Sequence, residues 1–108
     1  MDFAVRFRPR AVEREILIMI RMFIRHKVKD YRAWRKGYDG FDAERRTMGV
    51  KGAAVFQTAG DPTDVTVWHD FETLAKAKKF AGSQHLKDVM KHAGVKSVPK
   101  IWFASEAK

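Results

Sequence analysis

The stretch 30–49 constrains the fold more than any other part of the chain, because its large side chains recur on one helical face. They follow steps of three and four residues: Tyr31, Trp34, Tyr38, Phe41, Arg45 and Met48. This spacing is typical of one side of an α-helix. Asp30 is a suitable N-cap, and Gly49 can adopt the left-handed conformation that ends a helix. The sequence therefore predicts one helix over 30–49 with a buried aromatic face.

Two features of this predicted helix are not required for helix formation. Gly37 and Gly40 each cost about 1 kcal/mol relative to Ala in a helix interior. Close approach of a neighbouring helix explains them, and so does a notch in which a small molecule lies beside the aromatic ridge. Arg45 either contacts an anionic or carbonyl group of such a ligand or extends its charged end to water. Both pairs of alternatives stay open at this point.

Four other segments have the composition of β-strands, being rich in β-branched and aromatic residues: 16–28, 50–58, 65–71 and 98–103. The first is apolar on both faces in its first half, so it should be covered on both sides. Residues 60–64 contain Gly, Pro and Asp and predict the turn of a hairpin. Two short helices are expected between the last two strands, the first capped by Asp70 or Thr73 and the second by Ser83.

The resulting order is β-α-β-β-α-β with the second helical segment split in two. This order predicts an α+β fold, a ferredoxin-like sandwich with an antiparallel four-stranded sheet. Helices would cover one face of that sheet and leave the other bare, although the strands carry apolar side chains on both sides. Because a bare apolar face needs a partner, the pattern alone predicts a homodimer.

Length and composition limit the remaining possibilities. The 108 residues suffice for one domain, which we assign to 16–108, with 1–15 as a loose N-terminal arm. The chain contains no Cys, which excludes disulfides, thiol catalysis and Cys-ligated metals and fits a cytoplasmic protein.

The apolar run 16–20 is too short to span a membrane. The net charge of +9 is compatible with binding to nucleic acid, anionic lipid or an anionic ligand. It is equally compatible with a role in solubility alone.

One string of residues resembles a known group of proteins. It reads His26-x-Val28-x-Asp30-Tyr31-x-x-Trp34 and is followed by further matching positions: Phe41, Gly49, Val50, Trp68, Ala93, Gly94 and Val95. Over roughly 20–105 the chain resembles the dimeric α+β barrel superfamily. Within that superfamily, the chain most resembles the antibiotic-biosynthesis-monooxygenase-like members and a bacterial subgroup of unassigned role.

The resemblance implies that the sheets of two chains face each other as a barrel, with a ligand cleft between sheet and helices in each subunit. Known relatives include cofactor-free monooxygenases of aromatic polyketides, haem-degrading monooxygenases, polyketide cyclases and lactone isomerases. The first two groups commonly place an Asn in the cleft, but this chain contains no Asn. Trp68 and Arg45 are candidates for the Trp and Arg that often accompany it.

His26 and Arg45 are the candidate catalytic residues. His26 ends an apolar strand face just before the helix, and its side chain can move protons near neutral pH. The alternative role for His26 is to pin the strand–helix joint through a backbone hydrogen bond. Arg45 could stabilise developing oxyanion charge. At about 1.5 Å per helical residue, the two would lie towards opposite ends of a groove roughly 20 Å long.

The candidate ligand-binding residues are mainly aromatic: Trp34, Tyr38, Phe41, Phe56, Trp68, His69 and Phe80. Aromatic walls with few polar groups suit a flat organic ligand, although these residues could equally be core, and His69 a rim residue. His85 and His92 are seven residues apart, whereas helical metal pairs usually need three or four. We therefore expect no metal site and no cofactor.

Three functions follow from these observations. The first is an enzyme, monooxygenase-like or isomerase- or cyclase-like, that acts on an aromatic or polyketide-type molecule. The second is a non-catalytic dimer that binds a small aromatic or anionic ligand or takes part in a stress response. The third is RNA binding, since Lys51–Phe56 partly matches the signature of an RNA recognition module. Because Ala53 stands where an aromatic should stack, nucleic-acid binding is not expected.

Overall fold

The computed structural model describes residues 19–107, so the predicted arm 1–15 and the start of the predicted strand 16–28 lie outside the described residues. The elements run in the order β1 (Ile20–Lys27), α2 (Tyr31–Gly40), α3 (Asp42–Thr47), β2 (Gly52–Thr58), β3 (Asp61–Phe71), α4 (Leu74–Ala81), α5 (Gln84–His92) and β4 (Lys100–Ser105). The sheet has the order β2-β3-β1-β4, and all neighbouring strands are antiparallel. This confirms the predicted ferredoxin-like α+β fold, including the split of the second helical segment.

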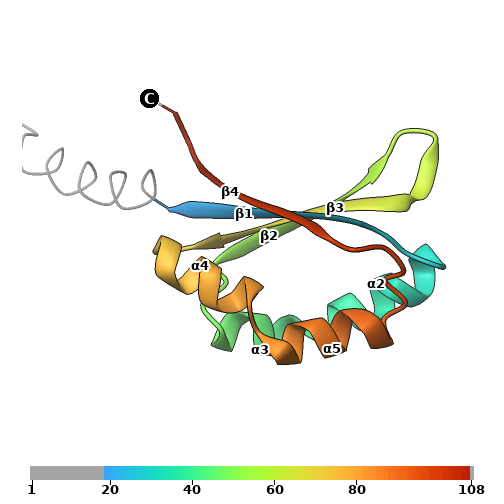
Figure 1. Ribbon diagram of the computed structural model, residues 1–108, viewed down its shortest axis with the longest axis horizontal. Helices are drawn as coiled ribbons and strands as arrows, with labels where there is room; N and C mark the ends of the chain where they lie inside the picture. The colour runs from blue at the N-terminus through green and yellow to red at the C-terminus, as the bar shows by residue number, and fades with distance from the viewer. Residues whose placement is uncertain (1–18, 108) are drawn as a thin grey trace, which may run out of the picture.

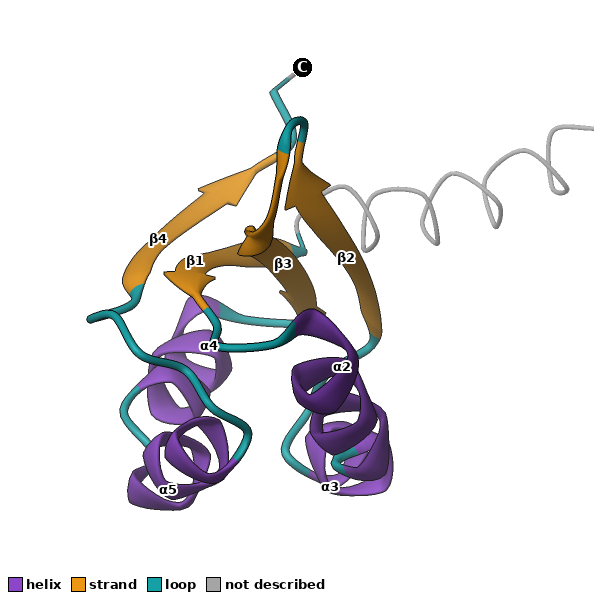
Figure 2. Ribbon diagram, turned by 90° about the vertical axis from the view of Figure 1, so that its right-hand side faces the viewer, coloured by secondary structure: helices purple, strands orange, loops and turns teal. Residues whose placement is uncertain are grey.

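All the described helices lie on one side of the sheet, with α2 and α3 forming one column and α4 and α5 another (Figures 1 and 2). The predicted caps start these helices. Asp30 accepts a hydrogen bond from the Ala33 amide at 2.9 Å. Thr73 and Ser83 cap α4 and α5 in the same way. Among the described residues, no helix is both long and apolar enough to cross a membrane.

The prediction of one continuous helix over 30–49 is wrong, because the helix is broken at Phe41. The Phe41 amide donates to the Tyr38 carbonyl at 3.1 Å, which tightens the end of α2. Gly40, a poor helix former, precedes the break. Phe41 stays 5% exposed, so the break bends the helix without removing the aromatic face from the core.

The predicted turn over 60–64 is also too long. β3 already begins at Asp61, and Gly60 adopts a φ of +83°, a conformation that glycine tolerates well. Pro62 then lies near the start of the strand, where a missing N–H is tolerated. The last strand likewise lies two residues later than predicted, at Lys100–Ser105.

The sheet has one covered and one open face. On the covered face, strand residues pack with the helices into the core: Met22, Ile24, Val28, Val65, Val67 and Phe71. On the open face, Phe23 stacks on Trp102 with ring centroids 5.1 Å apart. The Arg21 guanidinium lies 3.5 Å from the centre of the Trp68 ring. Aromatic side chains on this face agree with the expectation of strands apolar on both sides, and the homodimer itself stays a prediction.

Candidate functional site

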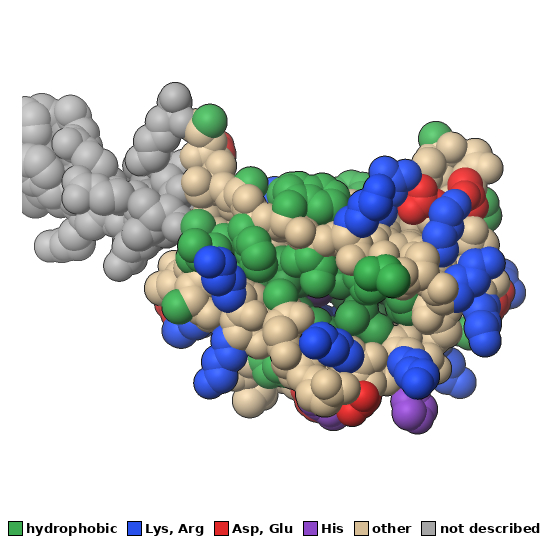
Figure 3. Space-filling model, viewed as in Figure 1, with side chains coloured by type: hydrophobic (Ala, Val, Ile, Leu, Met, Phe, Trp, Pro, Cys, Tyr) green, Lys and Arg blue, Asp and Glu red, His purple; other side chains and the backbone are tan. Residues whose placement is uncertain are grey.

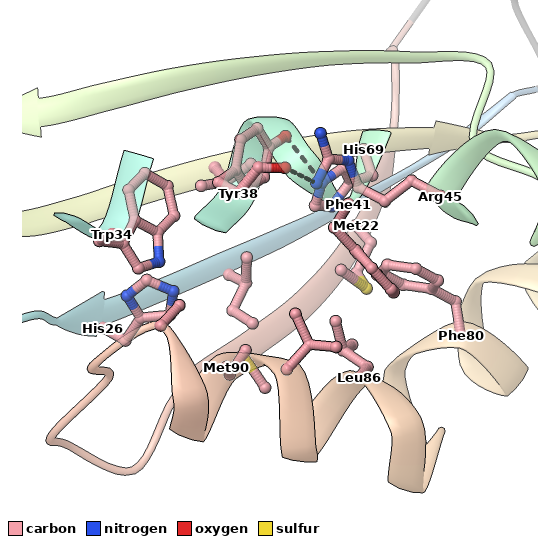
Figure 4. Close-up of a pocket in the computed structure, with 14 residues that line it drawn as sticks. Met22, His26, Trp34, Tyr38, Phe41, Arg45, His69, Phe80, Leu86 and Met90 are labelled. Carbon is pink, nitrogen blue, oxygen red and sulfur yellow. Dashed lines mark hydrogen bonds between the residues drawn. The ribbon is translucent and has the colours of Figure 1, made fainter. Parts of the chain in front are cut away.

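A cavity lies between the covered face of the sheet and the helices (Figure 4). Its volume is about 40 Å³. Most of its walls are apolar side chains from β1, β3, α2, α4 and α5. The residues that line it are Met22, Ile24, His26, Trp34, Tyr38, Phe41, Arg45, Val67, His69, Phe80, Leu86, Val89, Met90 and Ala93.

Most of the candidate site residues meet in this lining: His26, Trp34, Tyr38, Phe41, Arg45, His69 and Phe80. Sequence reasoning did not assign Met22, Ile24 and Val67 to the site. Met22 and Ile24 could have been identified from the sequence, because positions 22, 24 and 26 are every second residue of β1 and therefore share the face of His26. The α5 residues form a helical stripe in the sequence, but nothing local shows which strands that stripe covers.

Phe56 and Trp68 do not line the cavity, which corrects the expectation that they form part of its walls. Successive strand residues point to opposite faces. Since Val67 and His69 face the helices, Trp68 between them faces the open side. Val55 pairs with Val67 across the β2–β3 ladder, so the adjacent Phe56 also faces the open side, where it is 52% exposed.

His26 forms one end of the site. Its side chain is only 4% exposed, and its ring lies edge-on to Trp34 with centroids 5.6 Å apart (Figure 4). Its Nδ1 atom is buried and has no hydrogen-bond partner among the described residues. Burial lowers the pKa of His26 below its ordinary value, since desolvation disfavours the charged imidazolium. His26 is therefore a neutral imidazole at neutral pH.

His69 and Tyr38 form a second polar group of the site. The Tyr38 hydroxyl and His69 Nε2 lie 3.1 Å apart, and the ring nitrogen donates or accepts according to its tautomer. Burial, with a smaller contribution from the Arg45 charge, lowers the pKa of His69 to about 3. Burial also raises the pKa of Tyr38. Both groups are consequently neutral at physiological pH, and His69 Nδ1 is buried with no partner among the described residues.

Arg45 supplies the positive charge of the site. Its side chain is 4% exposed, so the alternative in which its charged end reaches water does not hold. The guanidinium lies 3.6 Å from the centre of the Tyr38 ring and donates to the Tyr38 carbonyl (Figure 4). Its Nη2 atom lies 3.4 Å from a carboxylate oxygen of Asp42. Arg45 Nε has no partner among the described residues.

Three buried polar atoms without partners thus belong to residues of one cavity: His26 Nδ1, His69 Nδ1 and Arg45 Nε. Buried polar atoms are usually hydrogen-bonded, and each one left unpaired costs about 1–3 kcal/mol. A ligand with polar substituents on an apolar body could satisfy such atoms. The described residues contain no cluster of three potential metal ligands. Neutral imidazoles beside a fixed cation suit proton transfer with stabilisation of a developing negative charge.

The cavity is smaller than most ligand pockets, which enclose about 300–1,000 Å³. A ring-sized ligand therefore requires the two columns of helices to separate. They approach closely at Gly37, where an added Cβ would lie 3.2 Å from Ala93 Cβ. No atom lies within 4 Å of the corresponding position at Gly40. Close approach of α5 thus accounts for Gly37 but not for Gly40.

No protein-family model matches the sequence, and no curated protein matches it. Solved structures do match. A conserved protein from Methanosarcina mazei Go1 is 14% identical with a TM-score of 0.71, over 88% of this chain and 99% of that one. A candidate antibiotic biosynthesis monooxygenase from Bordetella bronchiseptica is 18% identical with a TM-score of 0.71, over 83% of this chain and 98% of that one.

A third similar structure contains a ligand. It is a monooxygenase of Streptomyces coelicolor in complex with nanaomycin D, 14% identical with a TM-score of 0.62. The alignment covers 82% of this chain and 88% of that one. These TM-scores show that the matched chains share the fold described above. The chain has the ferredoxin-like α+β fold of the antibiotic biosynthesis monooxygenase-like proteins.

Proposed function

We propose that this protein is a monooxygenase-like enzyme that binds a flat aromatic or polyketide-type molecule in the cavity between sheet and helices. The observation that carries the proposal is the set of three buried, unpartnered polar atoms on His26, His69 and Arg45. The fold supports it, because solved structures that share this fold include a monooxygenase in complex with nanaomycin D. Trp34 and Tyr38, stacked with centroids 5.0 Å apart, would hold the rings of the substrate.

The proposed reaction begins with a proton transfer. Neutral His26 accepts a proton from an acidic C–H or phenolic O–H of the substrate, and the electron pair stays on the substrate as an enolate or phenolate. Arg45 stabilises the negative oxygen, as fixed charges in water-excluded sites do. The anion then reduces O₂, so that a ring CH₂ and O₂ give a ring C=O and H₂O. In an isomerase-like reaction the proton would instead return to another carbon.

Oxygen uptake with a hydroxylated anthrone tests this proposal, with product mass as a second readout. The wild-type chain should consume one O₂ per product, and the product should contain one more oxygen atom and two fewer hydrogen atoms than the substrate. We expect His26→Gln to lower kcat by about 10²- to 10⁴-fold, the usual contribution of a positioned acid–base group. His92→Gln is a matched control, because His92 is exposed on α5. Equal rates for wild type and His26→Gln would rule out His26 as the base.

A non-catalytic ligand-binding protein is the second candidate function. The small volume of the cavity favours it, because a site that must widen to admit a ring also releases that ring slowly. Saturable binding of the anthrone without oxygen uptake or isomerisation would support this function over the enzyme.

We further propose that the protein is a homodimer whose open sheet faces pack against each other. Trp102 is 44% and Phe56 is 52% exposed on this face, and exposed aromatic patches mark interaction sites. Arg21 and Asp70 pair at 2.8 Å on the same face. Because that pairing neutralises the two charges, they would not oppose burial of the aromatic residues.

A further inference from the structure

The flank of α5 that faces β4 carries two lysines beside the cavity. α5 contributes Leu86 and Met90 to the cavity wall, and Lys87 and Lys91 each follow one of them in the sequence. One residue corresponds to about 100° around a helix, so both lysines lie on the flank next to Met90. Both are exposed, and at a spacing of four they are neighbours on the helix surface.

The surface is hollowed at this flank. Figure 3, viewed as Figure 1, shows a hollow between the positions of β4 and α5, lined by hydrophobic side chains and bordered by Lys and Arg side chains. The opposite flank of α5 faces α2 instead, where Asp88 and His92 line a shallow groove with Gly37. The hollow is therefore a candidate entrance to the cavity, and its border is basic.

The acidic groups near α5 lie away from this hollow. Asp88 is on the α2 flank and accepts a hydrogen bond from Gln84 at 3.0 Å. Glu44 of α3 pairs with His85 at 2.6 Å on that same side. Within the described part of the chain, the lysines that form ion pairs with acids are Lys27 and Lys76. Lys87 and Lys91 thus place uncompensated positive charge beside an apolar opening.

We propose that Lys87 and Lys91 bind an acidic group of the ligand whose apolar rings occupy the cavity. The ligand class is then an aromatic anion, with a carboxylate, sulfonate or phosphate held at the entrance. This inference rests on the proposed function and adds the charge of the substrate to it. The occupant follows from charge complementarity: most of the cavity wall is apolar, its one charged lining residue is Arg45, and Lys87 and Lys91 on this flank are also positive.

A matched pair of fluorescent probes tests the inference. 8-Anilinonaphthalene-1-sulfonate carries a sulfonate, and N-phenyl-1-naphthylamine has the same rings without it. The wild-type chain should bind the sulfonate more tightly. The double variant Lys87→Gln with Lys91→Gln should lose most of that preference. Each lost ion pair should lower the affinity for the sulfonate probe by about 1.4- to 5-fold. Binding of the neutral probe should stay unchanged.

The control is a double variant with the same change in net charge, Lys51→Gln with Lys79→Gln, at two exposed positions outside the cavity lining. Equal affinities of the two probes for the wild-type chain would overturn the inference. So would an equal loss of sulfonate binding in both double variants, because it would show only a general charge effect.

Met90→Trp, which narrows the cavity, separates this inference from the proposed function. If the ring binds in the cavity, the variant should lose affinity for the neutral probe. Unchanged binding of the neutral probe would contradict the proposed ligand site, whereas a lost probe preference with intact neutral binding would contradict only the role of the lysines.

Discussion

The burial of His69 makes the free energy of unfolding depend on pH. The pKa of His69 is about 3 in the folded chain, against an ordinary value of 6.5. Between these values the unfolded chain binds a proton that the folded chain does not, so stability rises with pH. The stabilisation is complete above about pH 6.5 and is lost as the pH falls towards 3. His26, whose pKa burial also lowers, acts in the same direction.

Urea unfolding at pH 6.5 and pH 5 measures this effect. Between its two pKa values, a single group of this kind changes the free energy of unfolding by about 1.4 kcal/mol per pH unit. Protonation of His69 alone should therefore lower the free energy of unfolding by about 2 kcal/mol when the pH falls from 6.5 to 5. His69→Gln should make the dependence shallower by that amount. His92→Gln, at an exposed histidine, is the control. If His69→Gln leaves the pH dependence of the free energy of unfolding unchanged, His69 is protonated as readily in the folded chain as in the unfolded chain.

At the residue scale, alternation along a strand identifies the residues that line the cavity better than residue type does. Alternation along β1 and its extension puts Met22, Ile24 and Val28 on the face of His26, and all three lie in the core. Phe56 and Trp68 were assigned to the ligand site by residue type, and type does not determine the face of a strand. The hydrogen bond between Tyr38 and His69 was not predictable, since the two residues lie 31 positions apart in the chain.

At the scale of elements, the two glycines of α2 provide a matched comparison. Gly37→Ala and Gly40→Ala both improve helix propensity, by up to about 1 kcal/mol. At Gly37 the new methyl group would lie 3.2 Å from Ala93 Cβ, whereas no atom lies within 4 Å at Gly40. Urea unfolding should therefore show Gly40→Ala to be the more stable variant.

Ala93→Gly in the Gly37→Ala background tests the cause of that difference. Removing the Ala93 methyl group should recover part of the stability if the crowding between α2 and Ala93 is responsible. Additive effects of the two substitutions would contradict the close approach, because distant, independent sites add.

Element types were predictable, but several boundaries were not. The aromatic spacing over 30–49 continues through the break, because Phe41, the residue between α2 and α3, stays buried. Periodicity therefore does not reveal the break. The start of β3 at Asp61 depends on its pairing with Thr58 of β2, a contact that turn composition does not specify.

At the scale of the whole molecule, the open sheet face predicts the assembly. Light scattering at micromolar concentration should give twice the monomer mass of 12.5 kDa. Trp102→Glu places a charge on the aromatic face and should shift the protein to monomer. Ala43→Glu, which adds the same charge at an exposed position of α3 on the helix side of the sheet, is the control for charge. A wild-type mass of 12.5 kDa would contradict the proposed dimer.

The central claim is that the cavity between the sheet and the helices is the ligand site. A crystal structure of the wild-type chain with a hydroxylated anthrone tests it most directly. We expect the rings to lie against Trp34 and Tyr38, with a ligand oxygen within about 3.2 Å of His26 Nδ1 or His69 Nδ1. Rings bound on the open sheet face, with both histidine atoms still unpartnered, would contradict the claim.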